Sequence, residues 1–102
     1  MSVVLKNIAS YEGKKGDTDW WNWTAYIDAT KPDSLDDIAY VEYHLHPTFR
    51  NPVRQVHTKK DGFPLKTSGW GVFELKAKLV FEDKNKAPII LSHYLQFKTA
   101  DT

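Results

Sequence analysis

The chain has 102 residues, of which 41% are hydrophobic and 14% aromatic. This apolar content is enough to fill one hydrophobic core, so we expect a single domain over residues 1–102. The 14 basic residues nearly balance the 13 acidic ones, so the chain carries little net charge. Its electrostatic field is therefore too weak to attract nucleic acid or an anionic membrane regardless of sequence. The absence of cysteine excludes disulfides, thiolate nucleophiles and cysteine-ligated zinc.

Alternation of apolar and polar residues, the period of a half-buried strand, recurs along the whole chain. It predicts strands, in chain order, over residues 3–11, 21–28, 39–46, 53–57, 63–66, 71–81 and 89–97. Turn residues separate these strands at 13–16, 31–34, 51–52, 61–62 and 82–86. No helical stripe of ten residues occurs, and residues 35–38 suffice for one helical turn at most.

The four clearest alternations each place apolar side chains on one face of a strand. These faces comprise Trp21, Trp23, Ala25 and Ile27; Ala39, Val41, Tyr43 and Leu45; Phe73, Leu75, Ala77, Leu79 and Phe81; and Ile89, Leu91, His93, Leu95 and Phe97. Each face must be buried against a second layer. Seven or eight short antiparallel strands therefore predict an all-β, two-sheet β-sandwich.

Residues suited to catalysis are few. His44 and His46 have the spacing of a two-histidine metal clip, but a mononuclear site needs three or four ligands. Ser92 and His93 are adjacent, so they point to opposite faces of their strand and do not form a catalytic couple. No glycine-rich phosphate loop is present. We therefore expect no enzyme, no cofactor and no metal.

Two predicted loops contain aromatic and small polar residues, one over 45–52 and the other over 67–73. Phe49 and Trp70 are large apolar side chains that need a reason to lie at the end of a sandwich. Either they fold back to cap the core, or they face a ligand. From pattern alone, the prediction is a β-sandwich binding module.

At these loops the chain resembles the YEATS family. Residues 45–54, Leu-His-Pro-Thr-Phe-Arg-Asn-Pro-Val-Arg, are similar to the family's leucine–histidine–proline–serine/threonine–aromatic run. Residues 68–73, Ser-Gly-Trp-Gly-Val-Phe, are similar to its glycine–aromatic–glycine–any–phenylalanine signature. Thr18-Asp19-Trp20 and residues 91–97 match two further blocks in order. The tryptophan-rich segment 20–23 is more similar to the prokaryotic branch of the family.

This resemblance implies an immunoglobulin-like sandwich whose end loops bind acetyl-lysine or crotonyl-lysine. It implies that two aromatic walls, Phe49 and Trp70, flank the acyl amide, that the Thr48 hydroxyl binds this amide, and that the Trp70 backbone N–H binds the acyl oxygen. His46 would support Thr48, Phe73 would close one side, and Gly69 would leave room for the lysine stem. The implied ligand-binding set is His46, Thr48, Phe49, Ser68, Gly69, Trp70, Gly71 and Phe73.

Two positions in the loops depart from the pattern of many family members, one at Val72 and one at the pair Pro47-Thr48. Val72 replaces a small or acidic residue, which narrows the expected channel rim, and Pro47 with Thr48 replaces a glutamate–serine pair. The threonine keeps the hydroxyl but adds a methyl group, so the preferred acyl length is expected to differ.

The expected partner is an acylated-lysine peptide or protein, not nucleic acid or a membrane, and the domain is expected to form part of a larger multidomain protein. No export signal or long apolar run is visible, so a prokaryotic protein would be cytoplasmic and a eukaryotic histone reader nuclear. The alternative is a non-catalytic interaction or sensor module of a prokaryotic signalling or defence protein, with a different ligand.

Overall fold

The computed structural model describes residues 3–29 and 35–97, and these fold into seven strands in two antiparallel sheets. The strands are β1 (Val3–Lys15), β2 (Thr18–Ala29), β3 (Ile38–His44), β4 (Val53–Val56), β5 (Leu65–Gly69), β6 (Glu74–Phe81) and β7 (Ile89–Tyr94). The turn predicted at residues 31–34 lies outside the described residues. Within those residues, no helix is long and apolar enough to cross a lipid bilayer.

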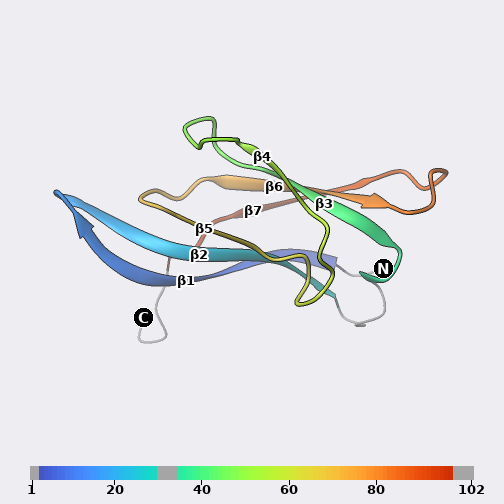
Figure 1. The fold of residues 1–102 in the computed structure, drawn as a ribbon, viewed down its shortest axis with the longest axis horizontal. Helices are drawn as coiled ribbons and strands as arrows, with labels where there is room; N and C mark the ends of the chain where they lie inside the picture. Colours follow the sequence, from blue (N-terminus) through green and yellow to red (C-terminus); the bar gives the residue numbers. More distant parts are fainter. Residues whose placement is uncertain (1–2, 30–34, 98–102) are drawn as a thin grey trace.

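The two sheets lie face to face (Figure 1). One has three strands in the order β1-β2-β5, and the other has four in the order β4-β3-β6-β7. Strands that are adjacent in the chain therefore often belong to different sheets, as do β4 and β5, and β5 and β6. The predicted all-β, two-sheet sandwich is confirmed.

Several strand boundaries differ from the prediction. The β1–β2 hairpin is longer than expected, because a bulge between Tyr11 and Gly13 lets pairing continue to Lys15 and Thr18. The predicted turn at 13–16 is therefore reduced to residues 16–17, where Gly16 takes a φ of 64°.

The second predicted loop is also shorter than expected. β5 spans Leu65–Gly69 instead of 63–66, so Thr67, Ser68 and Gly69 pair with β2 and only residues 70–73 form the connection to β6. Ser68 and Gly69 are therefore strand residues and not loop residues, paired with Asn22 and Trp21 at the edge of the three-stranded sheet.

The core contains the predicted inner faces of the central strands. Trp23, Ala25 and Ile27 from β2 are buried against Val41 and Tyr43 from β3 and against Leu75, Ala77, Leu79 and Phe81 from β6. Ala39 was expected in this set, but a register shift between Ile38 and Tyr40 puts Ile38 in the core instead.

Polar contacts close both open sides of the sandwich. On one side, His93 of β7 contacts Asn7 of β1, with 2.7 Å between Nε2 and Oδ1, so this histidine on an apolar strand face is hydrogen-bonded. On the other side, the Arg54 Nη1 of β4 donates to Thr67 Oγ1 of β5 at 3.4 Å. The sheets are therefore joined by more than their apolar faces.

Candidate functional site

The β3–β4 connection, residues 45–52, is a compact loop at one end of the sandwich. Leu45 N–H donates to Pro52 O at 2.7 Å and closes the base of the loop. Phe49 N–H donates to His46 O at 3.0 Å and closes a four-residue turn whose second residue is Pro47. Proline favours this position because its fixed φ matches the turn. The turn presents Thr48 and Phe49 at its outer end.

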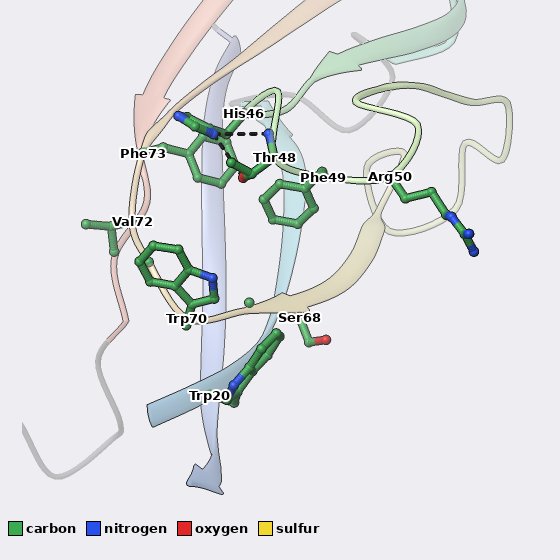
Figure 2. A pocket seen from close by; sticks show the side chains of 11 residues that line it. Trp20, His46, Thr48, Phe49, Arg50, Ser68, Trp70, Val72 and Phe73 are labelled. Carbon is green, nitrogen blue, oxygen red and sulfur yellow. Dashed lines mark hydrogen bonds between the residues drawn. The ribbon is translucent and has the colours of Figure 1, made fainter. Parts of the chain in front are cut away.

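His46 and Thr48 form a polar pair within this turn. Thr48 N–H donates to His46 Nδ1 at 3.3 Å, and the Thr48 hydroxyl lies 2.9 Å from the same nitrogen (Figure 2). Because Nδ1 accepts from the backbone, it also accepts the hydroxyl proton, and the imidazole carries its own proton on Nε2. The Thr48 oxygen then keeps its lone pairs for a donor outside the turn.

The Phe49 ring belongs to an aromatic cluster at the edge of the core. Its centroid lies 6.3 Å from that of Trp23, edge to face, and 5.4 Å from that of Phe73. The Phe73 ring lies 6.1 Å from His46, and the Phe73 carbonyl accepts from Leu95 N–H at 3.1 Å. Phe49 therefore both caps the core and borders the site, so the two readings of this side chain do not exclude one another.

Gly69 lies beside the aromatic cluster that contains Phe49 and Trp23. A Cβ added there would lie 3.4 Å from Phe49 Cζ and 3.9 Å from Trp23 Nε1. A methyl group at this position would therefore touch the Phe49 ring at ordinary van der Waals distance. A Cβ on Gly71 would meet nothing within 4 Å.

Trp70 begins the connection between β5 and β6, and 63% of its surface is exposed. Figure 2 shows its indole on one side of an opening, with Thr48 and Phe49 on the other. A large exposed indole is unusual for a side chain that merely fills a core. The two walls come from different parts of the fold, because β5 and the β3–β4 pair belong to opposite sheets.

All eight residues of the predicted ligand-binding set line one cavity of about 320 Å³. Trp20, Arg50 and Val72 complete its lining. Among the described residues that line it, none is aspartate or glutamate. The cavity is therefore flanked by aromatic rings and offers hydroxyl, imidazole and backbone groups, but no counter-charge for an ammonium group.

Trp20 was not assigned to the site from sequence. Trp21 pairs with Gly69 at the end of the β2–β5 ladder, so Trp20 lies one position further, next to Trp70. The Lys15 Nζ covers one face of its ring, 4.6 Å from the centroid. Only the register of β2 against β5 reveals this placement, and no local pattern in the sequence encodes that register.

The two histidines weighed as a metal clip have separate partners. His44 Nε2 lies 2.8 Å from Glu42 Oε1, whereas His46 is bound to Thr48. The chain leaves β3 at His44, so the two imidazoles do not share a strand face as the pattern suggested.

A family model of the prokaryotic YEATS domain matches residues 21–96. The chain belongs to the YEATS family. The YEATS chain is 43% identical over 80 residues to transcription initiation factor TFIID subunit 14 of Schizosaccharomyces pombe, covering 74% of this chain and 32% of that protein. It is 31% identical over 102 residues to TFIID subunit 14b of Arabidopsis thaliana, covering 97% and 37%. It thus spans about a third of the length of these relatives.

Solved YEATS structures have the same fold. The crystal structure of the yeast AF-9 homolog Yaf9 is 27% identical, with a TM-score of 0.78, covering 96% of this chain and 68% of that one. The Yaf9 YEATS domain bound to H3K27ac is 25% identical, with a TM-score of 0.75, covering 96% and 76%. The same domain recognising an H3K122suc peptide is 25% identical, with a TM-score of 0.74, covering 94% and 75%.

Proposed function

We propose that this YEATS domain binds an acylated lysine side chain in a peptide or protein, in the cavity between Phe49 and Trp70. The observation that carries the proposal is the joint presence of two opposed aromatic side chains, the Thr48–His46 pair and a lining without carboxylates. Acylation removes the lysine charge and leaves a flat amide, which suits such a cavity. The peptides bound by Yaf9 support the same ligand class.

The polar groups of the cavity match the two ends of an amide. The Thr48 oxygen, whose proton is directed to His46, accepts the N–H of the acylated amide. The Trp70 backbone N–H donates to the acyl oxygen. Each bond contributes on the order of 1 kcal/mol, and each aromatic contact about 0.5–1.5 kcal/mol.

Unmodified lysine is rejected because its ammonium group loses hydration on entry and gains no counter-charge. The sum of the favourable terms is small, so a dissociation constant of roughly 1 µM to 1 mM is expected. We propose recognition without turnover: the Thr48 hydroxyl lies beside His46 Nδ1, but no aspartate or glutamate lines the cavity to orient the imidazole as a catalytic base.

Titration with acetyl-lysine, crotonyl-lysine and unmodified-lysine peptides tests this function, with NMR shifts of the backbone amides of Thr48, Phe49 and Gly71, which line the cavity, as the readout. We expect saturable binding of the acylated peptides only. Trp70→Ala removes one wall and should abolish saturation. Tyr94→Ala is the matched control, because Tyr94 is 61% exposed but does not line the cavity.

A flat titration across the whole acyl series would contradict acyl-lysine binding. It would favour an interaction or sensor module that uses the same cavity for another ligand. Equal binding of modified and unmodified peptides would show instead that the cavity does not discriminate charge.

A further inference from the structure

Arg54 lies on β4, outside the cavity, and its guanidinium binds the loop that forms one wall of the site. Nε donates to Asn51 O at 3.0 Å, and Nη2 donates to Arg50 O at 2.9 Å. These two consecutive carbonyls follow directly after Phe49. The guanidinium carbon also lies 5.8 Å from the centroid of the Phe49 ring. One side chain therefore contacts both the backbone and the aromatic group of the wall.

The same guanidinium reaches the opposite sheet. Nη1 donates to Thr67 Oγ1 at 3.4 Å, in the partly buried space between β4 and β5. Thr67 precedes Gly69 by two residues and Trp70 by three, on the strand that ends at the second wall. Arg54 thus joins the loop that carries Phe49 to the strand that carries Trp70.

The loop backbone takes an uncommon conformation beside these contacts. Asn51 has a φ of 53°, in the left-handed region, which asparagine adopts more readily than most non-glycine residues. Arginine suits the task, because its planar fork directs several donors in fixed directions, whereas a lysine ammonium is a point charge on a flexible stem. A lysine at this position cannot serve three separated acceptors.

All three acceptors of Arg54 are uncharged. None of the ion pairs found among residues 3–29 and 35–97 includes this side chain. Its contacts are hydrogen bonds to two carbonyls and one hydroxyl, so salt screens them little compared with a long-range attraction between charges. The ionic-strength dependence of binding therefore separates a positioning role from electrostatic attraction of a ligand.

We propose that Arg54 is a positioning residue that fixes the Phe49 wall relative to the Trp70 wall and thereby sets the width of the acyl-lysine slot. Its effect on affinity rests on the proposed function. Its effect on the loop is a property of the domain without ligand.

The first test uses the protein alone. Hydrogen exchange of the Phe49 and Leu45 amides reports on the turn and on the base of the loop, because both amides donate within it. Arg54→Met should speed both by about tenfold or more, the effect of losing one or two hydrogen bonds to a charged donor. Arg54→Lys should behave like Arg54→Met, since it keeps the charge but not the fork. Lys66→Met, which removes a nearby charge from the outer face of β5, should change them less than twofold.

The second test measures affinity for an acetyl-lysine peptide at 0.05 and 0.5 M NaCl. Arg54→Lys and Arg54→Met should weaken binding by about tenfold at both salt concentrations, since the loss comes from wall geometry. Thr67→Val removes only the bond between the sheets and should weaken binding by about twofold. Should Arg54→Met fail to fold, Arg54→Lys and Thr67→Val decide the question.

Unchanged exchange of both amides in Arg54→Lys would overturn the positioning role. So would an affinity loss that disappears at high salt, because this would identify Arg54 as an electrostatic attractor. If the loop amides exchange faster in Arg54→Lys but the wild-type domain binds no acylated peptide, the positioning role stands and the proposed function fails.

Discussion

Thr48 is the residue whose chemistry in the site is best defined. Thr48→Val keeps the shape of the side chain but removes the oxygen that lies 2.9 Å from His46 Nδ1. We expect the free energy of acyl-lysine binding to weaken by about 1–2 kcal/mol, a loss of roughly 5- to 30-fold in affinity. Isothermal calorimetry measures it, with Thr24→Val on the outer face of β2 as the control. An unchanged affinity would remove Thr48 from the site.

Trp20 extends the aromatic lining of the cavity beyond the predicted residues. Because Lys15 covers one face of the indole, only the other face is available to a ligand. We expect Trp20→Ala to reduce affinity by about two- to tenfold, the equivalent of one aromatic contact. Tyr26→Ala, further along the same face of β2, is the control for peptide titrations. Equal affinities of wild type and Trp20→Ala would exclude a contact with the ligand.

At the residue scale, sequence reasoning identified eight of the cavity's residues and the contact between His46 and Thr48, but not the packing around Phe49. The motif residues predicted Phe49 and Trp70 as walls, and both border the same opening. The contact between Gly69 and the Phe49 ring depends on packing across the sheets, which the motif does not contain. Whether these residues bind an acyl group stays a prediction for the titrations to test.

Among the elements, β1 and β7 close one side of the sandwich through Asn7 and His93. Partial burial lowers the pKa of His93 below its ordinary value of 6.5. The neutral imidazole is therefore favoured in the folded state, and its contribution to stability is present above pH 6.5 and lost as the pH falls through the folded-state pKa.

This linkage predicts that the unfolding free energy of the wild type decreases between pH 8 and pH 5. His93→Gln keeps a donor for Asn7 but does not titrate, so its decrease over that range should be smaller. Urea denaturation at each pH measures the difference. Identical slopes for wild type and His93→Gln would rule out His93 as the source.

The elements also show what alternation can and cannot predict. The period of two located the central strands, because β2, β3 and β6 each bury one face. It could not locate the bulges near Tyr11 and Ile38, which depend on the pairing partner. For the same reason the end of β5 at Gly69 was mistaken for a loop, since nothing local distinguishes a paired Ser68 from an unpaired one.

On the scale of the whole molecule, a buried hydrogen bond joins the four-stranded sheet to the loop before β5. The Tyr43 hydroxyl donates to Phe63 O at 2.6 Å, and both side chains are fully buried. Tyr43→Phe leaves this carbonyl without its donor, so we expect the unfolding free energy to fall by about 1–3 kcal/mol. Chemical denaturation measures the loss, and Tyr94→Phe at the surface is the control. A loss no larger than that of the control would show that the carbonyl finds another donor.

The overall architecture was predictable because it needs only the count of strands and the demand that each apolar face be covered. The order of strands within each sheet was not, since it pairs β2 with β5 and β3 with β6, which are far apart in the chain. The position of the cavity at the end of the sandwich follows from this order. This strand order brings residues 70–73, which follow β5 in one sheet, beside residues 45–52, which follow β3 in the other sheet.

Phe49 is part of the cavity wall and, through its edge-to-face contact with Trp23, part of the interior. A compound that stacks on Phe49 adds to the cluster that holds the sheets together, so occupancy raises the melting temperature. A tenfold excess of ligand over its dissociation constant stabilises the fold by about 1.4 kcal/mol, which corresponds to several degrees in a domain of this size. Thermal-shift screening of compound libraries therefore detects even weak occupants of this cavity.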